Sequence, residues 1–209
     1  VMVKAGGTPA GARAARSHTA SLAGSDSVFE AVCAQAGVIK ARDLDDLFNI
    51  GAALLCQPLP QGHRIGIVTA GGGWGVLAAD ACAKAELEVV PLPEDTLAEL
   101  DGFLPAWWSR GNPVDLVAGV RGEAMIKALE TMLRCPEMDG IIVLGIMPVV
   151  PAERVFPSTS EEMKARWEET LLKAIGDTFD QFNVLAKRYN KPVIVAAELP
   201  FEDAGLETK

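Results

Sequence analysis

The sequence predicts an α/β fold in which a parallel sheet is covered by helices on both faces. Short apolar runs at 65–68 and 141–144 alternate with longer segments of helical periodicity. Such unbroken apolar runs are typical of strands that are buried on both faces, as in parallel sheets. The first run leads through a glycine cluster directly into a helical segment. This order indicates strand–helix–strand units.

Two prolines and a glycine within 57–63 mark a linker, so we expect two units, 1–57 and 58–209. The first unit is expected to begin with a buried strand at 1–5 and a long loop of small residues at 6–26. A helix at 27–36, a short strand at 38–39 and a second helix at 43–55 are expected to follow. Ser27 and Glu30 fit a capping box on the first of these helices, and Asp43 fits a cap on the second.

The second unit is expected to alternate strands and helices up to residue 197. Pro93 marks the start of one helix, Ser160 is suited to cap another, and Met125 and Leu129 share the apolar face of a third. The expected strands lie at 64–69, 87–90, 139–144 and 191–197, and the expected helices at 72–84, 94–103, 122–134 and 160–189.

Both ends of the chain resemble cuts in a longer protein. The strand at 1–5 has no initiator methionine and no signal peptide before it. The strand at 191–197 is followed by too few residues for another helix and strand. We therefore expect a piece of a larger protein.

The composition excludes several classes of protein. With 49% hydrophobic and 22% charged residues among 209, the chain is globular and not disordered. No apolar run reaches the roughly 18 residues that a membrane span needs. A net charge of −9 argues against a nucleic-acid-binding surface but permits a local anion site. The four cysteines lack the paired spacing of a disulfide or metal site, which predicts a reduced, cytoplasmic protein without a metal centre.

Four glycines, Gly71, Gly72, Gly73 and Gly75, follow a buried strand and open the next helix. Glycine lets the backbone approach an anion, and a helix N-terminus offers free N–H groups and partial positive charge. Their spacing loosely matches the dinucleotide fingerprint, but the next strand ends without the acidic residue that would hold a ribose. The cluster predicts an anion site or, alternatively, a turn in which glycines permit close packing of helix on sheet.

His18 stands between Ser17 and Thr19, shortly after Arg13 and Arg16. A neutral imidazole is a nucleophile toward phosphoryl groups, and hydroxyl and guanidinium groups can hold the transferred phosphate. A surface histidine in a polar loop explains the same residues. Both interpretations stay open at this point.

Two further features allow more than one interpretation. Asn112 precedes a proline in a turn that could place Asp115 at the edge of the sheet, or that could be structural only. Trp107 and Trp108 could anchor a further domain or pack on the core.

Several segments together resemble the NDP-forming acyl-CoA synthetases, the relatives of succinyl-CoA synthetase that include the ADP-forming acetate–CoA ligases. The matching segments are Lys-Ala-Gly at 4–6, the Ser-His-Thr segment at 11–26, and then 36–39, 43–48, 57–60, 64–80 and 111–116, in the order of the family. The resemblance covers residues 3–148 and returns at 191–197, whereas 149–190 is less typical.

The resemblance implies a flavodoxin-like domain preceded by the C-terminal part of a similar domain. It implies reversible conversion of acyl-CoA, nucleoside diphosphate and phosphate to carboxylate, CoA and nucleoside triphosphate, through an acyl phosphate and a phosphohistidine at His18. Two helix N-termini, near Ser25 and Gly72, would stabilise the phosphate. The implied phosphate-binding residues are Ser17, Thr19, Ser25, Gly71, Gly72, Gly73 and Gly75, and those of the acyl or substrate pocket are Trp74, Asn112 and Asp115.

The resemblance also implies partners outside this chain. These are a CoA-binding domain and an ATP-grasp domain, in the same protein or a second subunit, within an oligomer. CoA, ADP or ATP, and Mg²⁺ would bind through those domains, with no cofactor held by this chain; phosphate and acyl phosphate are its expected ligands. Ala20 and Trp74 replace the family's usual Gly and Pro, which we expect to stiffen the loop slightly and to reshape the pocket. The chain alone is expected not to turn over.

Two other functions stay open from the sequence. One is a non-catalytic regulatory or ligand-sensing module, such as the synthetase-like half of a fused protein acetyltransferase. His18 speaks against it, because a sensor does not need this nucleophile. The other is a flavodoxin-like nucleotide or flavin binder, for which no residue gives specific support.

Overall fold

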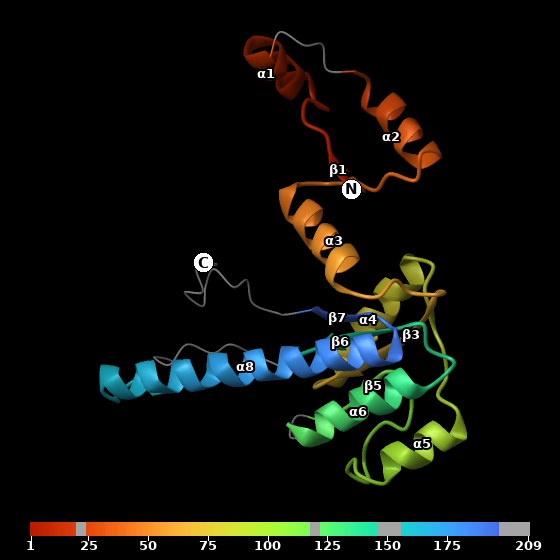
Figure 1. Ribbon diagram of the computed structural model, residues 1–209, viewed down its shortest axis with the longest axis vertical. Coiled ribbons are helices and arrows are strands. Elements are labelled where there is room, and N and C mark those ends of the chain that lie inside the picture. Colours follow the sequence, from red (N-terminus) through yellow and green to blue (C-terminus); the bar gives the residue numbers. More distant parts are fainter. Residues whose placement is uncertain (20–23, 118–121, 146–155, 197–209) are drawn as a thin grey trace. The chain divides into compact units, whose positions relative to one another are not determined.

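The computed structural model describes residues 1–19, 24–117, 122–145 and 156–196 (Figure 1). The chain divides into two compact units, Val1–Cys56 and Gln57–Lys209. Each unit combines parallel strands with helices, which confirms the predicted α/β class. Within the described ranges, no helix is long and apolar enough to cross a membrane.

The first unit contains a two-stranded parallel sheet and three helices. β1 (Met2–Val3) pairs with β2 (Lys40–Ala41), and the helices are α1 (Pro9–Thr19), α2 (Asp26–Gln35) and α3 (Leu44–Cys56). Apolar side chains of this unit are poorly covered: Phe48 and Leu55 are 70% and 88% exposed. Of its described hydrophobic residues, only Cys33 and Ala41 are buried.

The segment 6–26, expected as a loop, contains α1, so that prediction was wrong. Alanine is the strongest helix former, and α1 contains four. Thr8 caps the helix, because its Oγ1 accepts a hydrogen bond from the Gly11 amide at 3.1 Å. The strand expected at 1–5 also differs, since it pairs only at Met2 and Val3 and both side chains are exposed.

The capping box predicted for Ser27 and Glu30 is absent. α2 begins at Asp26, so Ser27 lies inside the helix, and Glu30 binds Lys40 at 2.7 Å. The cap predicted for α3 is confirmed. Oδ1 of Asp43 accepts a hydrogen bond from the Asp46 amide at 2.8 Å.

The second unit is built on a parallel sheet with four helices among its described residues. The strands are β3 (Arg64–Thr69), β4 (Glu88–Val89), β5 (Val114–Asp115), β6 (Gly140–Leu144) and β7 (Val193–Ala196), and the helices are α4 (Gly72–Lys84), α5 (Glu94–Asp101), α6 (Glu123–Arg134) and α8 (Glu161–Tyr189). The sheet order is β4-β3-β6-β7, and β5 pairs with the carboxyl end of β3. The chain thus runs from β3 to β4 on one side of β3 and later crosses to β6 and β7 on its other side, as in flavodoxin-like sheets.

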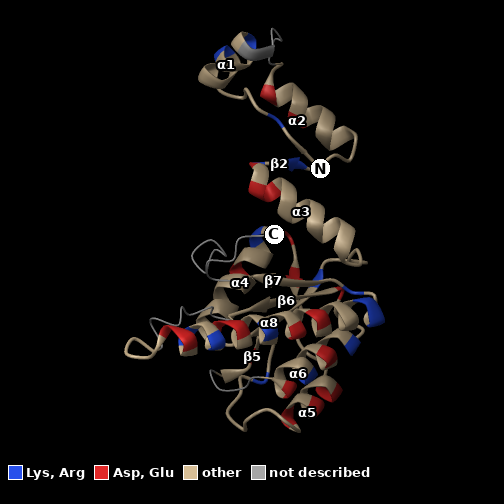
Figure 2. Ribbon diagram, turned by 60° about the vertical axis from the view of Figure 1, so that its left-hand side comes forward, with Lys and Arg blue, Asp and Glu red and all other residues tan. Residues whose placement is uncertain are grey.

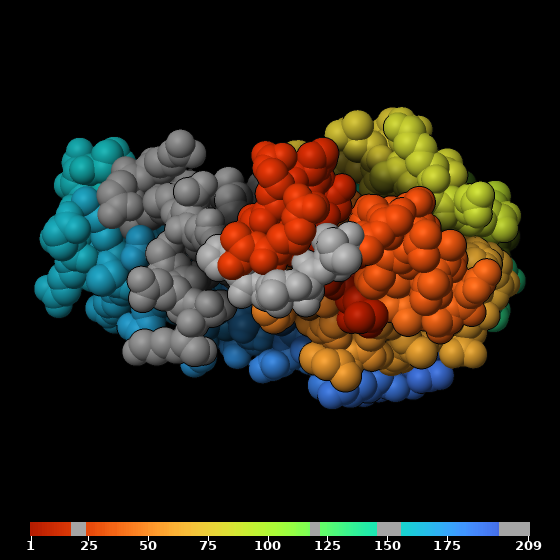
Figure 3. All heavy atoms as spheres, turned by 90° about the horizontal axis from the view of Figure 1, so that it is seen from above, coloured from red at the N-terminus to blue at the C-terminus, as the bar shows by residue number. Residues whose placement is uncertain are grey.

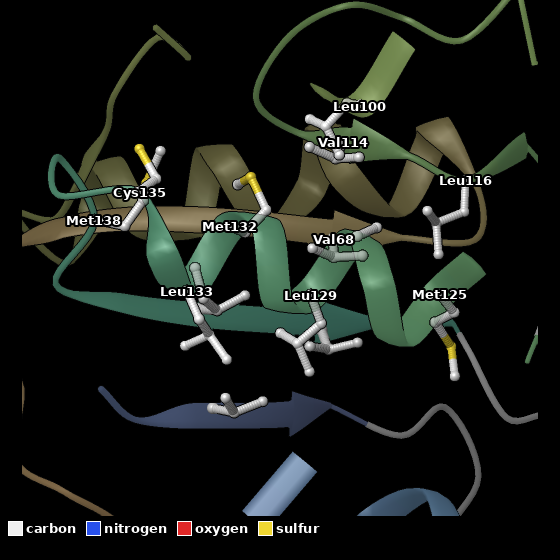
Figure 4. Close-up of a cluster of buried hydrophobic side chains, with 14 of the residues drawn as sticks. Val68, Leu100, Val114, Leu116, Met125, Leu129, Met132, Leu133, Cys135 and Met138 are labelled. Carbon is white, nitrogen blue, oxygen red and sulfur yellow. The ribbon is translucent and has the colours of Figure 1, made fainter. Parts of the chain in front are cut away.

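Alternate residues of the central strands face opposite helix layers. Ile65 and Ile67 pack with Cys82 of α4 on one face. Val68 faces a larger cluster that includes Leu100 of α5 and Leu129 of α6 (Figure 4). Side chains of α8 also belong to this cluster. Helices therefore cover both faces of the sheet, as predicted.

α8 carries acidic and basic residues along its length (Figure 2). The predicted cap is confirmed, because Oγ of Ser160 accepts a hydrogen bond from the Met163 amide at 3.4 Å. Asn190, in the left-handed conformation, ends the helix. Buried residues of α8 begin only at Ile175, so its second half packs on the core.

Candidate functional site

The Gly-rich turn, defined as residues 71–75, joins the carboxyl end of β3 to α4. Thr69 is fully buried and holds this turn: its Oγ1 accepts a hydrogen bond from the Gly71 amide at 3.2 Å and donates one to the Gly71 carbonyl at 2.9 Å. β3 pairs with both β4 and β6, so the turn lies where the order of the sheet reverses. Ligands of open α/β sheets bind at such positions.

The first turn of α4 presents free amide groups. The N–H groups of Trp74 and Gly75 donate to the Gly71 carbonyl, whereas those of Gly72 and Gly73 have no acceptor among the described residues. No side chain caps this helix. Free N–H groups and the helix dipole together favour a bound anion. A phosphoryl or carboxylate group is the chemistry that this arrangement can hold.

The glycines of the turn differ in what surrounds them. A Cβ atom on Gly75 would lie 2.9 Å from Cβ of Pro113 and 3.1 Å from Cγ2 of Thr69. A Cβ atom on Gly73 would have no neighbour within 4 Å. Glycine inside a helix costs about 0.5–1 kcal/mol relative to alanine. Close packing accounts for the glycine at position 75. At Gly73 the space in which we predict an anion is not filled by a neighbouring atom.

Asn112 joins strands of the sheet. Its Oδ1 accepts a hydrogen bond from the Ile67 amide at 2.9 Å, and its Nδ2 donates to the carbonyls of Ile65 at 2.9 Å and Val90 at 2.8 Å. Both amide hydrogens are therefore used by backbone groups. The following peptide bond, to Pro113, is cis. These bonds give Asn112 a structural role, and they lend no support to the predicted contact with substrate.

Asp115 places a carboxylate beside the start of α4. Its Oδ2 would lie 3.0 Å from a Cβ atom on Gly72, and its Oδ1 accepts a hydrogen bond from the Val117 amide at 2.9 Å. The residue is in β5, which pairs with the end of β3. The carboxylate fills the space beside Gly72, so the open side of the turn is at Gly73.

The tryptophans near this unit's surface have different surroundings. Trp74 is 46% exposed and borders the turn, since its Cδ1 would lie 3.3 Å from a Cβ atom on Gly71. Trp108 is buried and donates a 2.7 Å hydrogen bond to Asp101, whereas Trp107 is exposed. Of the two adjacent tryptophans, one therefore belongs to the core.

The Ser17-His18-Thr19 triplet forms the last turn of α1. Ser17 is exposed, and its Oγ donates to the Ala14 carbonyl at 2.8 Å. The side chains of His18 and Thr19, and the whole of Ala20, lie outside the described residues. The structure thus places the predicted nucleophile on a helix end and not in an extended loop.

α2 begins with a serine pair and a charged cluster. Oγ of Ser25 is 2.7 Å from Oγ of Ser27, and Ser25 makes no capping bond. Asp26 binds Lys4 at 3.2 Å and Lys40 at 2.8 Å. Hydrogen bonds from these ammonium groups, Lys40 foremost, lower the pKa of Asp26. The lysines are 22 and 14 residues away along the chain, so no local spacing reveals this cluster in the sequence.

The described residues offer no ready metal site. Among the described residues, no group of three or more His, Cys, Asp or Glu side chains could hold a metal ion.

A parallel sheet of this order, with a Gly-rich turn after its first strand, defines the second unit as a flavodoxin-like α/β domain. Known families give a more specific assignment. The Ligase-CoA domain model matches residues 65–176, more than half of the chain, and the succinyl-CoA ligase like flavodoxin domain model matches residues 1–54. The chain belongs to the family of succinyl-CoA synthetase-like, NDP-forming acyl-CoA synthetases.

Individual relatives agree with this assignment. The chain is 41% identical over 148 residues to the alpha subunit of acetate–CoA ligase (ADP-forming) II of Pyrococcus furiosus, covering 71% of this chain and 32% of that subunit. It is 31% identical over 198 residues to acetate–CoA ligase (ADP-forming) II of Archaeoglobus fulgidus, covering 95% of this chain and 26% of that protein.

A solved structure is also similar. The dinucleotide-forming acetyl-coenzyme A synthetase 1 of Ca. Korarchaeum cryptofilum, in complex with phosphate and ADP, matches with a TM-score of 0.67 and 30% identity over 93% of this chain and 38% of that one. The chain thus spans between 26% and 38% of the length of these relatives. These relatives are named as CoA ligases or as a CoA synthetase.

Proposed function

We propose that the chain is the phosphoryl-relay part of an NDP-forming acyl-CoA synthetase, which interconverts acyl-CoA, nucleoside diphosphate and phosphate with carboxylate, CoA and nucleoside triphosphate. One observation carries the proposal: a chain of this family has His18 in the last turn of α1 in one unit and an uncapped Gly-rich turn in the other. A regulatory module would need neither feature. The ADP-forming activity named for the relatives supports the same reaction class.

The proposed reaction consists of three transfers. A phosphate oxygen attacks the thioester carbonyl, the C–S bond breaks, and CoA leaves as its thiol, giving an acyl phosphate. An imidazole nitrogen of His18 then attacks the phosphorus atom, the P–O bond to the acyl group breaks, and the carboxylate leaves. The phosphoryl group finally passes from His18 to the terminal phosphate of the nucleoside diphosphate, which restores the free imidazole.

The chain's own residues have distinct tasks in this scheme. The free amide of Gly73, on the open side of the turn, holds a phosphoryl oxygen, because a fixed N–H group stabilises negative charge without reorganisation. The hydroxyls of Ser17, Thr19 and Ser25 hold the phosphate near the histidine. Exposed Trp74 forms one wall of the acyl pocket, and its bulk narrows the range of acyl groups.

Further domains complete the proposed enzyme. A CoA-binding domain and an ATP-grasp domain, in the same protein or a second subunit, supply CoA and the nucleotide with its Mg²⁺. In that assembly, residues 1–57 are the C-terminal part of one ligase domain and 58–209 begin the next. A cytoplasmic location fits the reduced cysteines, of which Cys82 and Cys135 have thiol pKa values raised by burial.

The test uses the full-length parent enzyme and the chain's two histidines. Incubation with acyl-CoA and radiolabelled phosphate is expected to label the protein with phosphate that is stable to base and labile to acid. His18→Asn is expected to abolish both the label and net synthesis of nucleoside triphosphate. His63→Asn, the matched control on an exposed histidine, is expected to change neither.

Full turnover by His18→Asn would overturn the proposal. Labelling of His63 in place of His18 would do the same. The 209-residue chain by itself is expected to form no nucleoside triphosphate, because the nucleotide site belongs to another domain.

A further inference from the structure

A charged cluster in the first unit links the two residues that flank the segment carrying His18 in the sequence. Nζ of Lys4 lies 3.2 Å from Oδ1 of Asp26, and Nζ of Lys40 lies 2.8 Å from Oδ2 of Asp26 and 2.7 Å from Oε1 of Glu30. Each carboxylate oxygen of Asp26 thus has its own ammonium group. Lys4 and Asp26 directly flank the segment 5–25, so their contact joins its two ends. Figure 3 shows the start of the chain, in dark red, beside α2, in orange.

The Asp26 carboxylate also lies against the backbone that leads into α1. A Cβ atom on Gly7 would be 3.2 Å from Oδ1 and 3.4 Å from Cγ of Asp26. The next residue, Thr8, caps α1 through its hydroxyl. A continuous set of contacts therefore connects Asp26 with the first turn of the helix on which His18 lies.

Apolar packing does little to fix α1. None of the side chains described for it, at 9–17, is buried, and an isolated helix of this length is marginal in water. The charged cluster is shielded on its lysine side, since the side chains of Lys4 and Lys40 are 13% and 25% exposed, whereas that of Asp26 is 38% exposed. Shielding strengthens ion pairs relative to those on an open surface.

We propose that Asp26, held by Lys4 and Lys40, is a positioning residue for phosphoryl transfer through His18. Its contacts among the described residues are with Lys4, Lys40 and the backbone at Gly7. It joins the two ends of the segment 5–25 and thereby determines where α1 presents its last turn. The proposal rests on the relay function proposed above for His18, and it predicts that the second and third transfers depend on Asp26 while the first does not.

The test compares two steps of the full-length enzyme in Asp26→Asn. The first is release of CoA from acyl-CoA by phosphate, and the second is single-turnover labelling of His18. A displacement of about 1 Å can slow a reaction about 100-fold, so we expect labelling to slow by about tenfold or more and CoA release by less than about twofold. Asp26→Glu, which keeps the charge, is expected to recover part of the labelling rate.

Asp46→Asn is the matched control. It removes a half-buried carboxylate that binds Arg42 in the same unit but does not flank the His18 segment. We expect both steps of this variant to match those of the wild type. A slowing of labelling by Asp46→Asn equal to that by Asp26→Asn would overturn the proposal.

Two further results would also overturn it: equal labelling rates in Asp26→Asn and wild type, or an equal fall in both steps, which indicates general loss of structure. If Asp26→Asn does not fold, the variants Lys4→Gln and Lys4→Arg test the proposal instead. Lys4→Gln removes the positive charge that pairs with Asp26 and should slow labelling, whereas Lys4→Arg keeps that charge and should not. An unlabelled wild-type enzyme together with an active His18→Asn variant would instead overturn the relay function itself.

Discussion

At Gly75 any side chain would collide with the ring of Pro113, whereas at Gly73 a methyl group would meet no atom within 4 Å. The sequence predicted an important cluster of glycines but could not separate their roles, because Pro113 is far along the chain. Asn112 shows the same limit. Its Asn-Pro pair predicted a turn, but its three hydrogen bonds to backbone groups of other segments depend on the folded sheet.

Alanine substitutions at these two glycines are expected to have opposite effects. Gly75→Ala forces a Cβ atom against a rigid proline ring, so we expect a loss of about 1–3 kcal/mol in the free energy of unfolding. Gly73→Ala removes a helical glycine from open space, so stability is expected to stay the same or rise by up to about 1 kcal/mol. Urea unfolding of the 209-residue chain, followed by tryptophan fluorescence, measures both values.

The same pair of variants tests the anion site in the full-length enzyme. The added methyl group of Gly73→Ala stands beside free amides, so its KM for phosphate is expected to rise although its fold is intact. An unchanged KM for phosphate in Gly73→Ala would show that this side of the turn does not hold the anion. A Gly75→Ala variant as stable as the wild type would contradict the packing role.

Among the elements, those of the second unit follow the sequence closely. β3 and α4 begin and end at the predicted residues, because strands buried on both faces give unbroken apolar runs. α1 was missed, because its glycine, alanine, serine and threonine residues are typical of a loop and none of its described side chains is buried. Its start depends on Thr8 and on contacts with Asp26, and the second of these is not local.

The starts of β3 and β6 are joined by Arg64 and Asp139. Nε and a terminal guanidinium nitrogen of Arg64 donate to the two carboxylate oxygens at 2.9 and 2.7 Å, and the Arg64 amide donates to Oδ2 at 2.9 Å. The Asp139 side chain is only 7% exposed. The Arg64 hydrogen bonds lower the pKa of Asp139 from 3.8 to about 2. This ion pair fixes the register of two central strands.

Asp139→Asn is expected to destabilise the second unit by about 1–2 kcal/mol at neutral pH, since water partly screens the exposed side of Arg64. The lowered pKa means that the carboxylate stabilises the fold above its unfolded pKa, near 3.8. That stabilisation is lost as the pH falls from there toward 2. The difference in unfolding free energy between variant and wild type should therefore shrink over this range, as urea titrations at neutral and acidic pH would measure.

Asp80→Asn provides the control for this pH dependence, because Asp80 is an exposed carboxylate on α4 of the same unit. It is expected to change the unfolding free energy little at either pH. A difference for Asp139→Asn that stays constant down to the lowest pH would contradict the assigned role of the carboxylate.

At the scale of the whole molecule, the hydrophobic core is divided unevenly. All described buried hydrophobic residues except Cys33 and Ala41 belong to the second unit. Burial of apolar surface is the main source of folding free energy, so the two units differ in the stability that they have on their own. The overall composition, with 49% hydrophobic residues, correctly predicted a folded protein but could not show this division.

We therefore expect the 209-residue chain to unfold in urea in two transitions, with the first unit unfolding at the lower concentration. All four tryptophans, Trp74, Trp107, Trp108 and Trp167, lie in the second unit. Their fluorescence should thus report only the later transition, whereas far-UV circular dichroism should also detect loss of α1–α3 in the earlier one. Leu129→Ala, in the second core, is expected to destabilise the later transition by about 2–5 kcal/mol and to leave the earlier one unchanged. Coincident curves from the two probes would contradict this division, because they would show that the units unfold as one cooperative structure.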